Sequence, residues 1–355
     1  MKQSAFYVLL LAILCIACSK QGSAVTAPPT APPPVMDTVL YKSLPFKMGA
    51  SINVNLLKNN TAYSAVVTKE FNSVTPENAM KMGALQPQQN VFNWADADYL
   101  VNFAATNGKR VHGHTLNWYN SLPAWVNTFS GDSAAWEQLL KTHIQTVVTH
   151  FKGKVSSWDV VNEAFNDDGS IRNSIWVQHL GTDYIARCFQ YARQADSAVL
   201  LFYNDYGQEY SAAKRNAIYA MVSSFKTRGI PVDGVGLQFH LTYTQTDANI
   251  AAAIASAVQT GLKVHIAELD IRLNSDKTKS VLTPELAAQQ AARYKTVVKA
   301  FASIPAQQQY GITTWNVSDA DSWIPAWQGA PDWPLPFDAN YKRKPAYGAI
   351  IEGSK

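Results

Sequence analysis

The sequence predicts a single α/β domain folded as a (β/α)8 (TIM) barrel. Short apolar or β-branched runs alternate with helical patterns, and this alternation recurs from Phe46 almost to the C-terminus. Parallel strands connected by helices produce such a pattern. A doubly wound open sheet is the competing architecture, but no Gly-rich phosphate-binding loop follows any of the strand runs.

Eight strands are predicted, each ending in polar or aromatic residues. In chain order they are Phe46–Asn53, Phe71–Asn78, Arg110–Leu116, Val155–Glu163, Val199–Asp205, Val235–His240, Lys263–Asp270 and Gly311–Val317. Between them, apolar residues at helical spacing predict helices such as Trp136–Phe151 and Leu286–Ala302.

The composition fits one large globular domain. Of 355 residues, 47 % are hydrophobic and 16 % are charged, which supplies a substantial core. The formal net charge of +4, from 30 basic and 26 acidic residues, is too small to indicate nucleic-acid binding. No apolar run is long enough to span a membrane in the mature protein.

The N-terminus has the features of an export signal. Residues 1–17 carry Lys2 and then an apolar stretch, too short for a transmembrane helix, that runs from Ala5 to Cys18. Ala17 directly before Cys18 resembles the bacterial lipoprotein box, in which the cysteine becomes the lipidated first residue, although Cys15 stands where Leu is usual. We expect a lipoprotein signal peptide with lipidation at Cys18; an ordinary cleaved signal is the alternative.

A Pro-rich tether is predicted over residues 18–39, which leaves residues 40–355 for the barrel. Its run of prolines from Pro28 to Pro34 favours an extended, semi-rigid spacer. The expected product is an exported protein anchored at the cell envelope or cell surface, with membrane contact only through the N-terminal lipid. Cys188 lies in an apolar helical pattern and is expected to be a packed thiol rather than a disulfide partner.

The polar strand ends indicate where the functional site lies. In a (β/α)8 barrel, the carboxyl ends of the strands converge on one open face. Alternation places Gln238 and His240 on one side of a strand, and likewise the pairs His112/His114 and Glu268/Asp270. Adjacent Asn162 and Glu163 point apart in a regular strand, so both reach a ligand only if the strand loses regularity there.

Two glutamates suggest the chemistry. Glu163 ends the fourth strand run and Glu268 lies near the end of the seventh, so their carboxylates are expected to face each other across the barrel mouth. Most glycosidases split an acetal with such a pair: one acid protonates the leaving oxygen, and the other attacks or activates water. The spacing of His and Cys gives no support for a metal site, and no Gly-x-Ser-x-Gly elbow is present.

Seven ordered motifs and a matching C-terminal stretch resemble family 10 of the glycoside hydrolases, the retaining endo-1,4-β-xylanases. The resemblance extends from about Lys47 to Ile351. The motifs are Asn72–Lys81, Gly113–Trp118, Trp158–Ala164, Tyr203–Tyr206, Gln238–His240, Glu268–Asp270 and Trp315–Asp319, followed by Pro336–Asp338 and Lys344–Tyr347.

The resemblance implies that Glu163 is the acid/base and Glu268 the nucleophile, with a covalent glycosyl-enzyme on Glu268 and no cofactor. It makes Asn162 similar to the residue that holds the sugar 2-hydroxyl. Gln238 and His240 are placed to hydrogen-bond the nucleophile and the base, and Asp270 to support that arrangement. The side chains expected to line the sugar site are Glu77, Asn78, Lys81, His114, Trp118, Trp315 and Trp323.

Several residues depart from the family pattern. Tyr119-Asn120-Ser121 stands where His-x-Gln is usual, Phe239 where a small residue is usual, and Asn316 where Gly is common. Trp327, near the last loop, is a further candidate for substrate contact.

The expected partners are therefore xylan and xylo-oligosaccharides, and the protein is expected to act as a monomer. Two alternatives stay open at this point. One is a barrel β-glycanase acting on another β-linked glycan. The other is a non-catalytic glycan-binding lipoprotein, although both carboxylates are retained.

Overall fold

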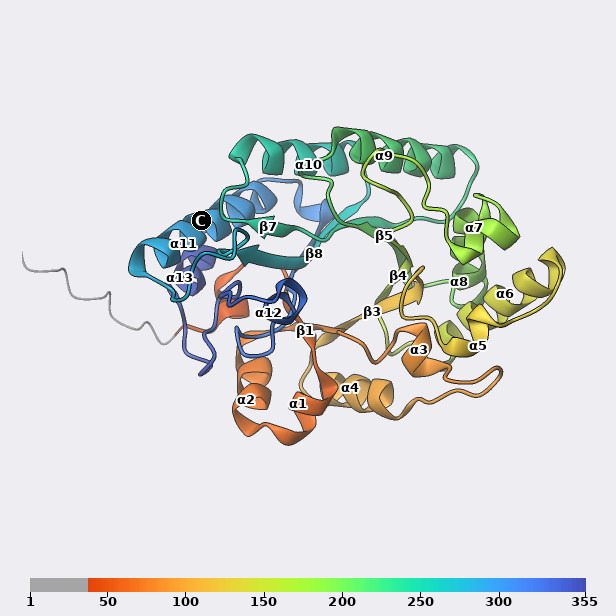
Figure 1. The fold of residues 1–355 in the computed structure, drawn as a ribbon, viewed down its shortest axis with the longest axis horizontal. Helices are drawn as coiled ribbons and strands as arrows, with labels where there is room; N and C mark the ends of the chain where they lie inside the picture. Colours follow the sequence, from red (N-terminus) through yellow and green to blue (C-terminus); the bar gives the residue numbers. More distant parts are fainter. Residues whose placement is uncertain (1–37) are drawn as a thin grey trace, which may run out of the picture. The chain divides into compact units, whose positions relative to one another are not determined.

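The structure, a computed structural model, describes residues 38–355. The predicted signal peptide, Cys18 and nearly all of the predicted tether lie outside the described residues. The predicted barrel itself is present, and Figure 1 shows its strands as a ring surrounded by helices.

The sheet closes on itself, which confirms the predicted (β/α)8 barrel. Its strands are β1 (Met48–Ile52), β2 (Ser73–Pro76), β3 (Arg110–Asn117), β4 (Ser157–Asn162), β5 (Leu200–Asp205), β6 (Gly234–Leu237), β8 (Lys263–Arg272) and β9 (Gln309–Thr314). Neighbours pair in parallel in chain order, and the β6–β8 and β1–β9 ladders complete the circle. A short strand, β7 (His240–Thr242), pairs with the end of β8.

One predicted strand is wrong in detail. The run Val235–His240 is not a single strand: β6 ends at Leu237, and β7 begins at His240. Phe239 between them has φ of 55°, in the left-handed region that a continuous strand excludes. Gln238 therefore lies just beyond the end of β6, whereas His240 begins β7.

Helices cover the outside of the barrel (Figure 1). They are α1 (Val54–Asn59), α2 (Thr61–Glu70), α3 (Met82–Leu85), α4 (Ala95–Thr106), α5 (Ala124–Asn127), α6 (Ser133–His150), α7 (Ile175–Leu180), α8 (Tyr184–Ala195), α9 (Ala212–Thr227), α10 (Asp247–Gln259), α11 (Pro284–Ala302), α12 (Ile324–Gln328) and α13 (Pro345–Gly353), with 3-10 turns η1 (Leu40–Ser43) and η2 (Ala306–Gln308). The helices predicted over Trp136–Phe151 and Leu286–Ala302 are α6 and α11. No helix in the described part of the chain is both long and apolar enough to cross a bilayer.

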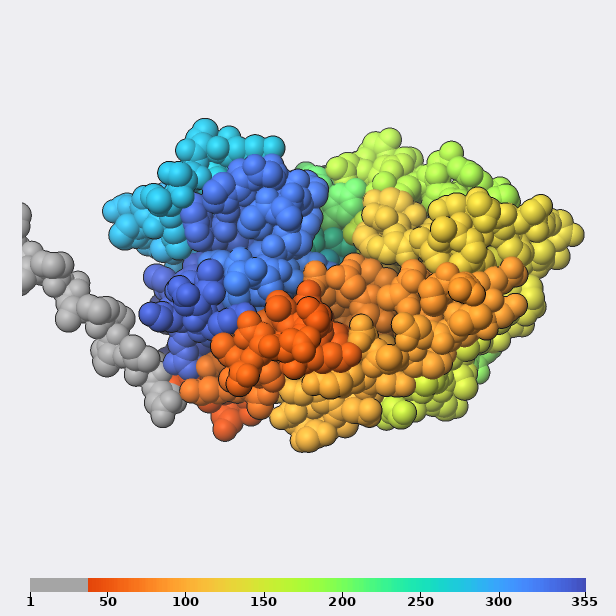
Figure 2. Space-filling view, turned by 60° about the horizontal axis from the view of Figure 1, so that its bottom comes forward, coloured from red at the N-terminus to blue at the C-terminus, as the bar shows by residue number. Residues whose placement is uncertain are grey.

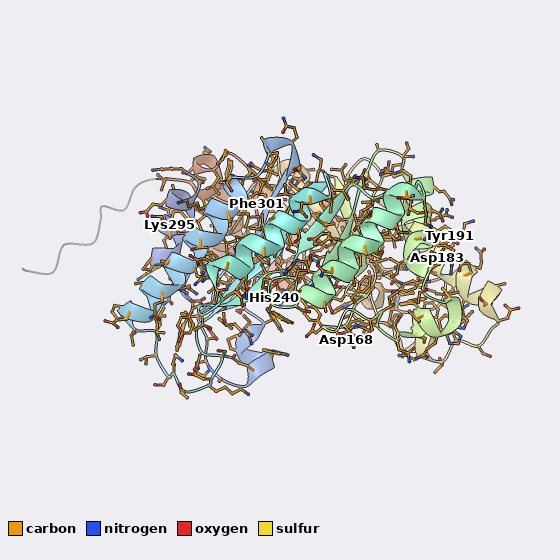
Figure 3. The ribbon with its side chains drawn as sticks, turned by 90° about the horizontal axis from the view of Figure 1, so that it is seen from above. Asp168, Asp183, Tyr191, His240, Lys295 and Phe301 are labelled. Carbon is orange, nitrogen blue, oxygen red and sulfur yellow. The ribbon has the colours of Figure 1, made fainter. Side chains whose placement is uncertain are left out.

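The helices present one apolar face to the barrel, as α11 illustrates. Phe301 is fully buried against the ring of Phe46, whereas Lys295 is exposed and pairs with Glu352. Figure 3 shows α9, α10 and α11 lying side by side, with Lys295 and Phe301 on α11. Thr283 caps this helix by accepting a hydrogen bond from the N–H of Leu286, as expected of a Thr before a helix.

Large rings fill the barrel interior below the site. His112 and His265 contact each other with ring centroids 4.7 Å apart, and Phe202 packs on Tyr310 at 4.6 Å. Burial and the neighbouring His112 and Arg110 lower the pKa of His265 well below its usual value, so this ring is neutral. The packed interior directs ligand binding to the carboxyl ends of the strands.

Cys188 is buried in α8, in agreement with the prediction of a packed thiol.

Candidate active site

A cavity of about 580 Å³ lies at the carboxyl ends of the barrel strands. In Figure 2, the blue C-terminal segment and the yellow segment face each other across a hollow with green segments behind it. The structure brings all the sequence-predicted contact residues into this one cavity. They are Glu77, Asn78, Lys81, His114, Trp118, Asn162, Glu163, Gln238, His240, Glu268, Trp315 and Trp323.

Glu163 follows directly on the end of β4 and has a strained backbone. Its φ of 58° is left-handed, a conformation that costs an L-residue about 1–3 kcal/mol. Its N–H donates to the carbonyl of Asn204 (2.9 Å), and its own carbonyl accepts from Nε of Arg172 (3.0 Å). The turn lets Asn162 and Glu163, although adjacent, both line the cavity. The predicted loss of strand regularity at this point is confirmed.

Within residues 38–355, the carboxyl group of Glu163 accepts hydrogen bonds only from neutral donors. Nε1 of Trp118 donates to Oε2 (2.9 Å), and Nε2 of Gln238 donates to Oε1 (2.9 Å). Nδ2 of Asn162 makes a longer contact to Oε1 (3.3 Å). Oε1 thus uses both acceptor positions, whereas Oε2 keeps one position open for a proton.

Glu268, on β8, has a different environment. Nδ2 of Asn204 donates to its Oε1 (2.7 Å), and Nε2 of His240 lies 3.1 Å from its Oε2. On the other side of the imidazole, Nδ1 of His240 lies 2.8 Å from Oδ2 of the fully buried Asp270. Burial alone lowers the pKa of His240, but Asp270 and Glu268 together outweigh it and raise that pKa to about 10. His240 is therefore an imidazolium at neutral pH, and Glu268 has a positive charge beside it.

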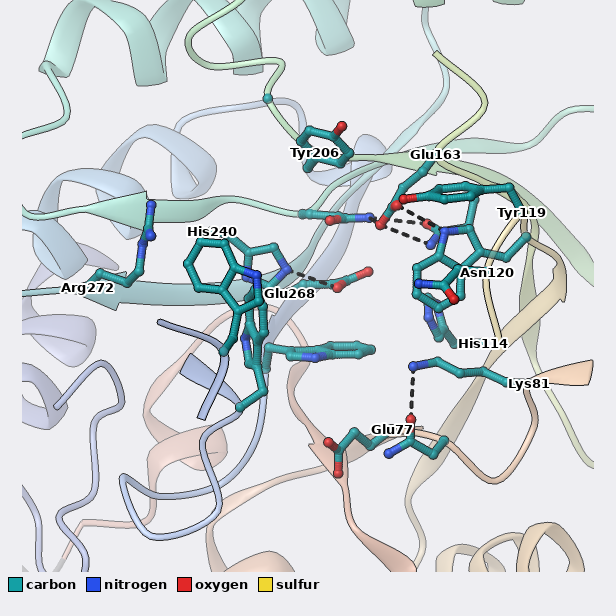
Figure 4. A pocket seen from close by; sticks show the side chains of 18 of the residues that line it. Glu77, Lys81, His114, Tyr119, Asn120, Glu163, Tyr206, His240, Glu268 and Arg272 are labelled. Atoms are coloured by element: carbon teal, nitrogen blue, oxygen red, sulfur yellow. Dashed lines mark hydrogen bonds and ion pairs between the residues drawn. The ribbon is translucent and has the colours of Figure 1, made fainter. Parts of the chain in front are cut away.

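Amide side chains connect the two carboxyl groups. Oδ1 of Asn162 accepts from Nδ2 of Asn204 (3.0 Å) and from Nε2 of Gln238 (3.2 Å). Because Asn204 also bonds Glu268 and Gln238 also bonds Glu163, one network fixes both glutamates. Figure 4 shows the two carboxyl groups facing the same part of the cavity.

Gly236 on β6 makes room for this network. A Cβ atom at this position would lie 2.2 Å from Oδ1 of Asn204, closer than any real contact. Asn204 can therefore reach Glu268 only because the neighbouring strand has no side chain there.

The buried carboxylate of Asp159 positions His114 at the cavity wall. Oδ2 of Asp159 lies 2.9 Å from Nδ1 of His114 and 3.0 Å from Nε2 of His112. Burial opposes ionisation of Asp159, but the two histidines hold its pKa far below the usual range. His112 and His114 thus share one side of β3, as predicted, and only His114 reaches the cavity.

The opposite part of the lining combines charged, amide and aromatic groups. Nζ of Lys81 donates to Oδ1 of Asn78 (2.9 Å) and lies 5.0 Å from the ring centre of Trp118. Burial lowers the pKa of Lys81 and raises that of Glu77. Oε2 of Glu77 is buried and has no hydrogen-bond partner within residues 38–355.

Two indoles form the aromatic wall. Trp315 follows β9 and packs edge-on against His114, with ring centroids 5.2 Å apart. Trp323 donates from Nε1 to Oδ2 of Asp270 (2.9 Å). Asp270 does not line the cavity but holds both His240 and Trp323, in keeping with its expected supporting place.

Sequence reasoning missed several residues of the site. Asn204 bonds Glu268 directly, and the strand-end motif Tyr203–Tyr206 was a signal that could have identified it. Further lining residues without a predicted role are Tyr119, Asn120, Tyr206, Gly207, Glu209, Tyr210 and Arg272, whereas Trp327, the further candidate for substrate contact, also lines the cavity. Burial raises the pKa of Glu209 to about 7, and its Oε2 has no hydrogen-bond partner in the described part of the chain.

The fold and the site together define a class of protein. A (β/α)8 barrel with two glutamates at the mouth, amide donors on both carboxyls and indole walls is a glycoside hydrolase site. The sequence places the chain more closely: the profile of glycosyl hydrolase family 10 matches residues 37–353, and the chain belongs to that family.

Relatives of known activity include fungal and bacterial enzymes. The chain is 39 % identical over 300 residues to endo-1,4-beta-xylanase A of Phanerodontia chrysosporium, covering 83 % of this chain and 71 % of that one. It is 36 % identical over 324 residues to endo-1,4-beta-xylanase A of Thermoanaerobacterium saccharolyticum, covering 87 % and 27 %. It is also 36 % identical over 324 residues to exoglucanase XynX of Acetivibrio thermocellus, covering 87 % and 29 %. The chain thus spans less than a third of these two bacterial proteins.

Solved structures agree. Native xylanase 10C of Cellvibrio japonicus superposes with a TM-score of 0.85 at 37 % identity, covering 88 % of this chain and 72 % of that one. A mutant of an intracellular xylanase of Thermoanaerobacterium saccharolyticum, in complex with xylotetraose, superposes with a TM-score of 0.81 at 34 % identity, covering 88 % and 98 %.

Proposed function

We propose that the protein is an endo-1,4-β-xylanase that hydrolyses internal bonds of xylan with retention of anomeric configuration. The observation that carries the proposal is the contrast between the two glutamates. Glu268 lies beside the imidazolium of His240, whereas Glu163 accepts only from neutral amide and indole groups. A retaining glycosidase needs one ionised and one protonated carboxyl group at the same moment.

The reaction then proceeds in two displacements. In the first, Glu268 attacks the anomeric carbon while Glu163 gives its proton to the departing glycosidic oxygen, leaving a glycosyl ester on Glu268. In the second, the Glu163 carboxylate takes a proton from water, the water oxygen attacks the anomeric carbon, and the ester bond to Glu268 breaks. The open acceptor position on Oε2 of Glu163 is where the transferred proton resides.

The remaining lining residues offer polar and aromatic contacts to a sugar chain. Asn162 is held by Asn204 and Gln238 and is assigned to the 2-hydroxyl of the reacting sugar. The indoles of Trp315 and Trp323 offer apolar faces to pyranose rings. A xylose unit has no hydroxymethyl group, and a tight wall at its carbon 5 would discriminate against a sugar that carries one by about 10–200-fold.

Replacement of Glu268 by Ala tests the nucleophile. Turnover of an aryl xylobioside should fall by several orders of magnitude, and azide should restore it with formation of an inverted glycosyl azide. Glu163→Ala is the matched comparison: it should spare substrates with good leaving groups far more than xylan, and azide should then give a product of retained configuration. A Glu268→Ala enzyme that azide does not rescue would contradict the assignment.

A second substrate class has one observation in its favour. The similarity to an exoglucanase at 36 % identity makes cello-type chains a candidate. Product chromatography on plain xylan, mixed-linkage glucan and cellulose separates the two, and release of reducing sugar from any of them rules out a protein that only binds glycans. Short internal-cleavage products from xylan alone would support the xylanase.

We further propose that the protein works as a monomer at the cell envelope or cell surface, anchored by a lipid on Cys18. The lipoprotein-like sequence before Cys18 supports this placement. Radiolabelled palmitate should label the full chain in its bacterial host, and Cys18→Ser should abolish labelling and release the enzyme. Size-exclusion chromatography of the released enzyme should give the mass of one chain.

A further inference from the structure

Arg272 lines the active-site cavity with its positive charge unpaired. Within residues 38–355, it is the one arginine whose guanidinium neither donates a hydrogen bond nor meets a carboxylate. Its contact is a cation–π interaction with Trp327, whose ring centre lies 5.2 Å from the guanidinium carbon. The other cations of the lining are occupied, since Lys81 donates to Asn78 and His240 is shared by Glu268 and Asp270.

The strand register places Arg272 beyond the reacting centre. It is the last residue of β8, four residues after Glu268, so the two side chains leave the strand on the same side. A strand rises by about 3.3 Å per residue, which sets Arg272 roughly 13 Å farther along than Glu268. In Figure 4, Arg272 and Lys81 lie on opposite sides of the two glutamates.

Trp327 completes the surface around Arg272. Its side chain is 62 % exposed, and no other large hydrophobic residue in the described part of the chain is more exposed. Trp323 packs against it with centroids 5.2 Å apart. An exposed indole beside a guanidinium offers a sugar ring an apolar face and a fork of N–H donors at once.

We propose that Arg272 and Trp327 form a binding site for a uronic acid branch on the xylan chain, which makes acidic xylan the preferred substrate. This inference rests on the proposed xylanase function. A guanidinium matches a carboxylate in a two-bond fork, a geometry that a neutral hydroxyl does not provide. The carboxylate would also be the partner that Arg272 lacks, since it pairs with none of the acidic residues of the cavity lining, Glu77, Glu163, Glu209 and Glu268.

The test compares glucuronoxylan with the same polymer after its uronic acid carboxyl groups have been reduced to hydroxymethyl groups. The two substrates differ only at these groups, which are carboxylates in one and neutral hydroxymethyl groups in the other. For the unmodified enzyme, kcat/KM should favour the acidic polymer by about 5–10-fold at low salt, as expected for a partly exposed charge-assisted pair, and the preference should shrink as salt is added. Arg272→Ala should bring the ratio close to one, and Arg272→Lys should give an intermediate value because the charge stays and the fork is lost.

Arg228→Ala is the matched control. Arg228 is an exposed arginine paired with Asp183, away from the cavity lining, and its loss changes the net charge by the same amount. For Arg228→Ala, the ratio of kcat/KM on the acidic polymer to kcat/KM on the reduced polymer should equal that of the unmodified enzyme. Equal ratios for Arg272→Ala and the unmodified enzyme, or a loss of the same factor on both polymers, would overturn the inference.

Direct binding separates this inference from the proposed function. If no xylan is hydrolysed, the proposed function fails, and calorimetry with an acidic xylo-oligosaccharide and its neutral counterpart then decides the role of Arg272. Tighter binding of the acidic compound, by about 5–10-fold, that disappears in Arg272→Ala would support the site. Equal binding of the two compounds would refute it.

Discussion

The charge on His240 depends on Asp270, and Asp270→Asn should reveal how strongly. Nδ1 of His240 lies 2.8 Å from Oδ2 of Asp270, and the carboxylate is fully buried. Asparagine keeps an acceptor of similar shape for His240 and for Trp323 but removes the negative charge. The perturbation is therefore mainly electrostatic.

The expected magnitude follows from the separation of the charges. Two unit charges about 4 Å apart interact by about 4 kcal/mol at an effective dielectric constant of about 20. Since about 1.4 kcal/mol corresponds to one pKa unit, Asp270→Asn should lower the pKa of His240 from about 10 by roughly 2–3 units. Glu268 remains beside the ring, so the proton is still partly stabilised.

Histidine NMR titration measures this directly. The chain has seven histidines, and a His240→Gln spectrum assigns the signal in question. Asp276→Asn is the control, because Asp276 is an exposed carboxylate paired with Lys279. A His240 pKa that shifts by less than one unit in Asp270→Asn would show that the ion pair does not set the charge of the imidazole.

The same shift predicts how stability depends on pH. A histidine whose pKa rises on folding contributes stability that is fully present below its unfolded value of 6.5 and is lost as the pH rises toward 10. The difference between these two values corresponds to at most about 5 kcal/mol. In urea unfolding between pH 6.5 and 9.5, the free energy of unfolding of the unmodified enzyme should fall over the whole range. In Asp270→Asn, where the folded pKa of His240 is lower, this fall should end at a lower pH.

Three further substitutions test other parts of the structure. Gly113→Ala should destabilise the fold by about 3 kcal/mol in urea unfolding, because the added Cβ would lie 2.2 Å from the ring of Trp158. Arg172→Ala should lower kcat on xylan about tenfold more than on an aryl xyloside with a good leaving group, because Arg172 holds the backbone carbonyl of Glu163; equal losses would argue against it. Burial lowers the pKa of His143 to about 4, so stability should fall by up to about 3 kcal/mol as the pH drops from 6.5 to 4, and His143→Gln should flatten that decline.

The sequence was sufficient to place the site because barrel topology converts strand ends into neighbours. Glu163 and Glu268 are far apart in the chain, yet Glu163 directly follows β4 and Glu268 lies in the carboxyl-terminal half of β8, in one closed sheet. The polar ending of each strand run was visible without coordinates. Alternation along β3 likewise predicted that His112 and His114 share a side, and both meet Asp159.

Contacts between side chains of distant strands were not predictable in the same way. Asn204 bonds Glu268, 64 residues later in the chain, and can do so only because Gly236 leaves the intervening strand bare. The strand-end motif Tyr203–Tyr206 marks Asn204 as a residue of the barrel mouth, but nothing in the sequence indicates that its partner is Glu268 or that Gly236 makes room for the contact. Arg272 is a similar case. The proposed role of Arg272 depends on its guanidinium having no carboxylate or hydrogen-bond partner within residues 38–355, and that can be seen only when every side chain around it is placed.

The residues that depart from the family pattern show the limit most clearly. Ser121, Phe239 and Asn316 all have left-handed φ, at 54°, 55° and 82°. The small residue that is usual in the family at position 239 and the glycine that is common at position 316 therefore have a conformational reason. For a residue such as phenylalanine, this conformation costs about 1–2 kcal/mol. Phe239 is fully buried, and burial of a phenylalanine side chain contributes about 1.5–3 kcal/mol, which offsets the cost.

Asn316 offsets the same cost by hydrogen bonding. Asparagine tolerates the left-handed region better than most residues, and Oδ1 of Asn316 accepts a hydrogen bond from the N–H of Trp323 (3.2 Å). Glycine has no side chain to make this bond. Asn316 thus ties Trp323 of the aromatic wall to the segment that follows β9. The indole of Trp323 also donates to Asp270, the residue whose carboxylate sets the charge of His240. Asparagine in place of the common glycine at position 316 therefore adds a hydrogen bond that holds Trp323 in the aromatic wall.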